Sequence, residues 1–275
     1  MATRIITGVV LAPLVVYLFL WGPDWANALF FIAVAWIGAF ELFRILFPGH
    51  WGLAEKTALG MTALLPVVGW LDARNDVSTW PVFFVLGLGV VLVAKLFRPA
   101  PIEDANDATG RLVLAYAYGG LLFLFPLLLA LHYRPWLMVL TAAVWLGDTG
   151  AYFAGKSLGR NKLYPAISPK KTIEGSIGGL IASGLGGWLA VVIVEAANDP
   201  WPTEWAPMAP VLAVAFGVVC GATEQVGDLV ESMMKRSAKV KDSGTILPGH
   251  GGILDRFDGF VFAAPFLYAL VAAVS

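Results

Sequence analysis

The run LVLAYAYGGLLFLFPLLLAL, residues 112–131, contains no charged side chain and has the length of a helix that crosses a bilayer. A helix rises 1.5 Å per residue, so about 20 residues span the roughly 30 Å of hydrocarbon. Similar apolar runs recur at 5–21, 26–47, 57–72, 80–97, 136–156, 176–197, 208–231 and 259–274. The sequence therefore predicts an all-α, polytopic transmembrane helical bundle of about nine spans.

Composition also favours a membrane protein. The chain has 275 residues, of which 59% are hydrophobic and 13% are charged, whereas a soluble domain carries about 25% charged residues. The one cysteine, Cys220, lies in an apolar run, which excludes a disulfide framework and a zinc site built on cysteines. We expect one integral membrane domain, 1–275, with N-terminal spans in 1–135 and a second, catalytic half in 136–275.

The positions of the basic residues predict the orientation of the chain. With the N-terminus in the cytoplasm, all of the 18 Lys and Arg residues except Arg74 and Arg134 fall in inner segments, as the positive-inside rule expects. Arg4 before an apolar run also resembles a signal peptide, but the many spans behind it favour an uncleaved first helix. Two inner loops, 156–175 and 231–258, carry much of the positive charge, so we expect the functional residues to face the cytoplasm.

Several acidic residues lie inside or at the edge of the predicted spans. A carboxylate at the centre of a membrane helix costs about 2.5–3.5 kcal/mol, so it usually faces a cavity, a partner or an ion. Interhelical salt bridges are the alternative, and for Glu41 and Glu224 the sequence leaves both interpretations open. We expect Asp148 about 12 Å below the cytoplasmic end of its helix. The residues concerned are Glu41, Asp148, Glu224, Asp228 and Glu231.

The stretch 232–258, SMMKRSAKVKDSGTILPGHGGILDRFD, is rich in residues that bind phosphate. Asp228, Ser232 and Lys235 follow one another at i, i+4 and i+7, so one helical face carries an acid, a hydroxyl and a base. Lysine and arginine side chains pair with phosphate oxygens, and glycine turns let backbone N–H groups approach an anion. The basic residues are Lys235, Arg236 and Lys241, and the glycines are Gly249, Gly251 and Gly252.

Two aspartates close this stretch. Asp255 and Asp258 are three residues apart, so both can point to one side of a helix that begins there. Oxygen ligands of this kind suit Mg²⁺, which often accompanies nucleotide phosphates. In the alternative interpretations Asp258 is an N-terminal helix cap, or the stretch is a charged loop against anionic lipid headgroups.

The other inner loop contains Ser168-Pro-Lys-Lys-Thr-Ile-Glu-Gly175. Serine followed by proline is a common helix opening, so we expect Ser168 to cap a helix with Pro169 in its first turn. Lys170 and Lys171 would strengthen the attraction of that helix N-terminus for anions. An ordinary capped span with basic residues that follow the topology rule remains an equal alternative.

These motifs together resemble the phosphatidate cytidylyltransferases, also called CDP-diacylglycerol synthases. The stretch 232–258 contains that family's Ser, Lys-Arg, Lys-Asp, His-Gly-Gly and Asp-Arg-x-Asp elements at the family's spacing. The runs 147–152 (GDTGAY) and 168–175 also resemble the family, in the expected order. The resemblance covers about 140–275, whereas the first five spans match only in hydropathy.

The resemblance implies the reaction of CTP with phosphatidate to give CDP-diacylglycerol and pyrophosphate, with Mg²⁺ as cofactor and a second cation left open. It implies catalytic roles for Asp228, Lys241, Asp242, Asp255 and Asp258, and metal-binding roles for Asp228, Asp255, Asp258 and Asp148. The phosphate-binding residues that it implies are Lys170, Lys171, Ser232, Lys235, Arg236, Gly249, His250, Gly251, Gly252 and Arg256.

Two other functions are weighed against this one. A CTP-dependent lipid-alcohol kinase would transfer the γ-phosphate and release CDP. A transporter would spread its acidic residues through the bilayer and would show repeats, and the sequence contains no repeat. We expect membrane lipids but no nucleic acid among the partners, a bacterial inner membrane location with the active site in the cytoplasm, and we leave a homodimer open.

Overall fold

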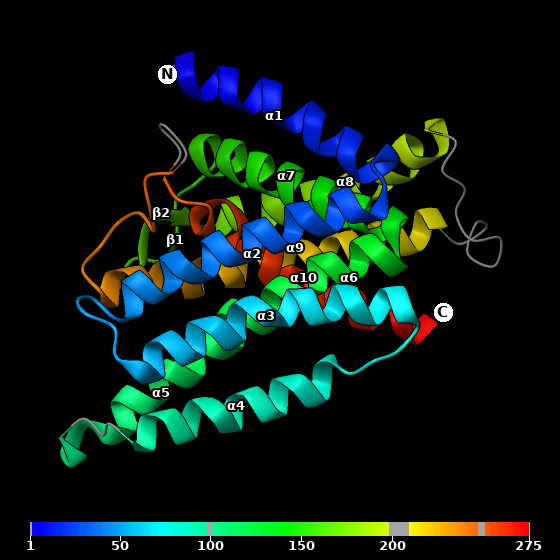
Figure 1. The fold of residues 1–275 in the computed structure, drawn as a ribbon. Helices are drawn as coiled ribbons and strands as arrows, with labels where there is room; N and C mark the ends of the chain where they lie inside the picture. The colour runs from blue at the N-terminus through cyan, green and yellow to red at the C-terminus, as the bar shows by residue number, and fades with distance from the viewer. Residues whose placement is uncertain (1, 98–100, 198–208, 247–250, 275) are drawn as a thin grey trace. The chain divides into compact units, whose positions relative to one another are not determined.

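The computed structural model describes residues 2–97, 101–197, 209–246 and 251–274, with side chains from residue 12 onward (Figure 1). The fold is almost entirely helical. The elements are α1 (Ala2–Trp21), α2 (Asp24–Leu46), α3 (Leu53–Asn75), α4 (Trp80–Leu96), η1 (Ile102–Asp104), α5 (Ala105–Tyr116), η2 (Ala117–Leu122), α6 (Phe123–His132), α7 (Arg134–Ser157), β1 (Lys162–Tyr164), β2 (Ser168–Thr172), α8 (Ile173–Ala196), α9 (Ala209–Ser237) and α10 (Leu254–Val274).

Six helices in the described part of the chain are long and apolar enough to cross a membrane. The expected helical membrane bundle is therefore confirmed, while the count of nine spans and the orientation of the termini stay predictions. Two further apolar helices, Ala12–Trp21 and Trp80–Leu96, are shorter. The six are Asp24–Leu46, Ile102–His132, Arg134–Ser157, Ile173–Ala196, Pro210–Ser237 and Leu254–Val274.

Two helices extend beyond their apolar runs into the second inner loop. Helix α9 continues to Ser237 and α10 begins at Leu254, so the connection between them is 238–253 and not the predicted 231–258. Polar side chains support the extra turns of α9, because Lys235 pairs with Glu231 and Ser232 donates to Asp228, each four residues apart. Hydrophobic periodicity alone does not predict helical turns that are made of polar residues.

The first inner loop contains a two-stranded hairpin. Strand β1 pairs antiparallel with β2, with Lys162 opposite Thr172 and Tyr164 opposite Ser168. The prediction that Ser168 caps a helix is wrong, because Thr172 is the cap and its Oγ1 accepts a hydrogen bond from Gly175 N at 3.1 Å. A residue before proline favours extended backbone, which explains why Ser168-Pro169 lies in a strand.

The chain divides into two compact units. Unit 1 comprises Met1–Pro23, Tyr133–Arg236 and Phe257–Ser275, and unit 2 comprises Asp24–His132 and Ser237–Arg256. Within unit 1, α7 and α8 pack closely through small residues, since a methyl group on Gly150 would clash with Ala182 and with the Gly178 carbonyl. This close packing brings the second half of α7 against the start of α8.

The core of unit 2 lies among α2, α3, α4 and α5. Phe43, Leu112 and Tyr116 are fully buried there. The Tyr116 ring stacks on Phe84 with 5.0 Å between ring centroids, and its hydroxyl donates to the Phe84 carbonyl at 3.0 Å. The π-helical turn η2 then joins α5 to α6, so that 105–132 forms one continuous helical segment.

Candidate functional site

Unit 1 contains a cavity of about 340 Å³, with several charged side chains on its wall, that is formed by α7, the hairpin, the start of α8 and α9. Three lysines lie on its wall, and two acidic residues accompany them. Such a mixture of charges in one cavity suits a ligand that is itself multiply charged. Its polar and charged lining residues are Asp148, Tyr152, Lys156, Lys170, Lys171, Thr172, Ser176, Glu224 and Gln225.

An ion pair joins the hairpin to α9 at this cavity. Lys171 Nζ lies 2.6 Å from Asp228 Oδ2, and both side chains are about three-quarters buried. The other carboxylate oxygen of Asp228 accepts a hydrogen bond from Ser232 Oγ at 3.2 Å. Two of the predicted site motifs, 168–175 and 228–235, are therefore in direct contact through charged groups.

Acidic side chains gather around Asp228. Glu224 is 4% exposed, and the carboxylates of Asp148, Asp228 and Asp258 all lie near enough to repel its charge. Asp258, on α10, is close to Asp228. The described part of unit 1 thus collects four carboxylates in one region, and this arrangement favours an added cation.

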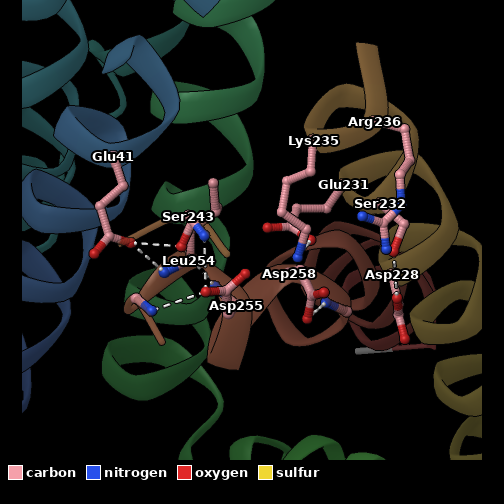
Figure 2. Close-up of polar contacts among 12 residues, drawn as sticks. Glu41, Asp228, Glu231, Ser232, Lys235, Arg236, Ser243, Leu254, Asp255 and Asp258 are labelled. Atoms are coloured by element: carbon pink, nitrogen blue, oxygen red, sulfur yellow. Dashed lines mark hydrogen bonds and ion pairs between the residues drawn. The ribbon is translucent and has the colours of Figure 1, made fainter. Parts of the chain in front are cut away.

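A second ion pair borders this acidic group. Lys235 pairs with Glu231, whose side chain is fully buried, and Lys235 itself is 9% exposed. Figure 2 shows both side chains on the side of α9 that faces Asp258. In the described part of unit 1, Lys235 therefore interacts with the carboxylates of Glu231 and Asp258.

The acidic group has the chemistry that Mg²⁺ requires, although its oxygens are not gathered as ligands. Carboxylate oxygens are hard donors of the kind that this ion prefers. In the described residues, no group of three or more His, Cys, Asp or Glu side chains is arranged to hold a metal ion. The donor type fits a magnesium site, and the assignment of Asp228, Asp258, Asp148 and Asp255 as ligands stays a prediction.

The hairpin is fixed by a residue whose role the sequence did not indicate. Glu174 accepts hydrogen bonds from Arg160 N at 3.1 Å, from Asn161 N at 3.2 Å and from Asn161 Nδ2 at 2.8 Å. Arg236 also reaches the hairpin, with its Nε 3.5 Å from the Ile167 carbonyl oxygen. Lys170 and Lys171 are therefore carried by a strand that is anchored next to them.

Two further residues of the cavity, Ser176 and Gln225, also have no role among the predictions from the sequence. Ser176 donates a hydrogen bond to the Gln225 side-chain oxygen, and Gln225 Nε2 donates to the Ser176 carbonyl at 3.2 Å. These bonds hold α8 against α9 beside Glu224. An amide inside an apolar run was the available signal in the sequence, since uncharged polar residues in spans often bridge helices.

The other predicted site residues lie in unit 2, where two carboxylates hold the end of the signature stretch (Figure 2). Asp255 Oδ2 accepts hydrogen bonds from Ser243 N at 2.9 Å and from Gly252 N at 2.8 Å. Glu41 Oε2 accepts from Ser243 Oγ at 3.0 Å and from Leu254 N at 2.8 Å. The salt-bridge interpretation of Glu41 is wrong for the described residues, because its contacts are a hydroxyl and a backbone N–H.

The remaining predicted residues fall in several environments. Asp258 is not a helix cap, because α10 begins four residues earlier, at Leu254. Gly251 has a φ of +82°, which favours glycine, and a methyl group on Gly252 would clash with Ser243 and Glu41. The positions Gly249 and His250 lie outside the described residues. Exposed side chains are Lys170, Arg236, Lys241, Asp242 and Arg256.

Comparison with known proteins gives consistent results. A family model described as the cytidylyltransferase family matches residues 2–274. The chain is 36% identical to a phosphatidate cytidylyltransferase of Bacillus subtilis over 100% of this chain and 99% of that protein. It is 44% identical to one of Staphylococcus saprophyticus over 52% of this chain and 50% of that protein, and 48% identical to one of Synechocystis over 47% and 41%.

Proposed function

Because the chain belongs to the cytidylyltransferase family, we propose that it transfers a cytidylyl group from CTP to phosphatidate, giving CDP-diacylglycerol and pyrophosphate for phospholipid synthesis. The observation that carries this proposal is the cavity of unit 1, whose wall combines lysines with acidic residues beside the Lys171–Asp228 ion pair. The substrates that it takes are a nucleoside triphosphate and a lipid with an anionic phosphate.

The chemistry needs no activated side-chain nucleophile. A phosphate oxygen of phosphatidate forms a bond to the α-phosphorus of CTP, and the bond from that phosphorus to the oxygen bridging to the β-phosphorus breaks. Pyrophosphate leaves with the bonding electron pair. The attacking oxygen is already ionised, so the barrier comes from repulsion between two anions, and catalysis rests on positioning and on cations.

The side chains of the cavity can supply that neutralisation. Lys171 would exchange its Asp228 partner for a phosphate oxygen, and Lys170 and Arg236 are exposed next to it on the hairpin and on α9. Lys156, over the Tyr152 ring at 5.8 Å, adds a further positive charge to the cavity wall. Ser232 would donate a hydrogen bond to phosphate once Asp228 is engaged elsewhere.

Mg²⁺ is the proposed cofactor. Asp228 and Asp258 of unit 1 would hold it, with Asp148 as a further ligand, on the basis of the donor chemistry described above. Asp255, which the sequence also suggests as a ligand, lies in unit 2 and binds backbone N–H groups there. When bound, the ion supplies positive charge that offsets the charge of the phosphates.

The site is proposed to face the cytoplasm from the bacterial inner membrane. CTP is a cytoplasmic metabolite, and the positive-inside bias of the sequence favours the same side for the loops 156–175 and 231–258. A two-tailed lipid substrate stays in the bilayer, so its phosphate has to meet CTP at headgroup depth. The cavity lies at the C-terminal end of α7, beside the hairpin and the start of α8, which is consistent with that depth.

Labelled CTP tests the reaction directly. Purified protein in mixed micelles with phosphatidate is supplied with CTP labelled in the α- or the γ-phosphate. The proposal expects lipid that is labelled only from the α position, together with release of pyrophosphate. If a lipid alcohol is added to the micelles, lipid labelled from the γ position with release of CDP would instead identify a lipid-alcohol kinase. No labelled lipid under either condition would refute both reactions.

A further inference from the structure

Glu41 is a buried acid of α2 whose hydrogen bonds, among the described residues, all come from the signature stretch 232–258. It is 2% exposed. Its Oε2 accepts from Ser243 Oγ and from Leu254 N, residues that stand 202 and 213 positions further along the chain. Oε1 is buried and makes no hydrogen bond within the described residues. Glu41 therefore holds residues on both sides of 247–250 at one point.

Asp255 reinforces the same attachment from the other side. Its Oδ2 accepts from the backbone N–H groups of Ser243 and Gly252, while its own N–H lies 3.3 Å from Ser243 Oγ. Ser243 thus stands between two carboxylates, its hydroxyl bound to Glu41 and its backbone to Asp255 (Figure 2). We name these three residues, Glu41, Ser243 and Asp255, the carboxylate clamp.

The clamp determines where α10 begins. The first N–H groups of a helix have no partner inside the helix, and Glu41 accepts the hydrogen bond of the first of them, at Leu254. The clamp also ends the segment that carries Lys241 and Asp242, which directly precede Ser243. The start of α10 in turn sets the direction of Asp255 and, one turn later, of Asp258.

We propose that Glu41 is a positioning residue for cytidylyl transfer, acting through the clamp on the segment 241–246 and on the first turn of α10. The inference rests on the proposed function. Glu41 does not touch the reacting phosphates in this role. It fixes, from a helix outside the signature, the backbone that carries the proposed catalytic residues Lys241, Asp242 and Asp255.

Asp72 offers a matched comparison within the same unit. It is 5% exposed and accepts hydrogen bonds from Thr79 Oγ1 at 2.6 Å, Thr79 N at 2.6 Å and Trp80 N at 2.7 Å, at the start of α4. Like Glu41, it is a buried carboxylate that holds one hydroxyl and the first N–H of a helix. It differs in that none of its hydrogen bonds within the described residues involves the signature stretch, so its replacement measures the structural cost alone.

The experiment compares Glu41→Ala, Glu41→Gln, Asp72→Ala and the wild type in detergent, measuring kcat, the KM values for both substrates, and the midpoint of thermal unfolding. Misplacing reacting groups by about 1 Å costs about 100-fold in rate, so we expect Glu41→Ala to lose about that factor in kcat while KM changes little. Glu41→Gln keeps an oxygen acceptor and should recover most of kcat. Asp72→Ala should lower the unfolding midpoint and leave kcat near wild type.

Several results would overturn the inference. It fails if Glu41→Ala retains wild-type kcat, if Asp72→Ala loses kcat equally, or if Glu41→Gln is as inactive as Glu41→Ala. Should Glu41→Ala not fold, Ser243→Ala removes one of the two bonds to Glu41, and a normal kcat in that variant would equally refute the role. A wild-type protein that forms no CDP-lipid would overturn the proposed function as well, whereas an active wild type with an active Glu41→Ala overturns the inference alone.

Discussion

Replacement of Lys171 by methionine tests the proposed cavity most directly. The change keeps the length of the side chain and removes its charge, 2.6 Å from Asp228 and beside Glu224. Loss of one positioned donor to a developing charge costs about 10²–10³ in kcat. Because Asp228 and Glu224 already interact with the charge of Lys171, we expect a loss at the lower end of this range, about 100-fold in kcat.

The stability cost of this change should be small by comparison. At an effective dielectric constant of about 20, unit charges 2.6 Å apart attract by about 6 kcal/mol, and desolvation of both groups offsets most of that. Each side chain also keeps about a quarter of its surface exposed, which screens the pair further. We therefore expect a loss of about 1 kcal/mol, so the enzyme stays folded.

The assay is release of pyrophosphate from CTP in phosphatidate micelles, with Lys162→Met as the control. Lys162 lies on β1, is exposed, and does not line the cavity. The control should retain wild-type activity and a wild-type unfolding midpoint. If Lys171→Met kept kcat/KM within about threefold of the wild type, Lys171 could not be a phosphate ligand and the use of this cavity would be wrong.

Three further substitutions follow from the same geometry. Thr172→Val removes the cap of α8 and should cost about 1 kcal/mol of stability in thermal unfolding; an unchanged midpoint would contradict the capping role. Glu231→Gln leaves the charge of Lys235 buried and should lower the free energy of unfolding by about 3–5 kcal/mol. The double variant with Lys235→Met should recover part of this loss, and an unchanged stability of Glu231→Gln would contradict the role of the pair. Asp258→Asn should raise the Mg²⁺ concentration for half-maximal activity, and an unaltered Mg²⁺ titration would argue against metal binding there.

Hydrophobic periodicity predicts the helices well because long apolar runs have few alternatives to a membrane helix. It fails at the helix ends, where polar residues continue the helix. The last turns of α9 depend on the Glu231–Lys235 pair, and α10 begins before its apolar run, at a residue held by Glu41. The prediction of Ser168 as a cap fails because the pairing of two strands keeps 168–172 extended, and this pairing is not visible in the local sequence.

The site is predictable where its residues stand close together in the sequence. The motif spacing identified Asp228, Ser232 and Lys171, and the structure brings these three together. Glu174 and Glu41 were not assigned roles, because their hydrogen bonds go to backbone groups whose position depends on folding. A sequence shows which hydrogen-bond donors are present, but it does not show which distant N–H group will donate to a given carboxylate.

The position of Glu41 in the sequence has a consequence for the synthesis of the protein. Its helix is made early, yet the hydroxyl and the N–H that satisfy it arrive more than 200 residues later in synthesis. Until then α2 carries a carboxyl group whose two hydrogen-bond donors have not yet been synthesised. A chain that stops before Ser243 therefore lacks both of the donors that satisfy this carboxyl group in the folded protein.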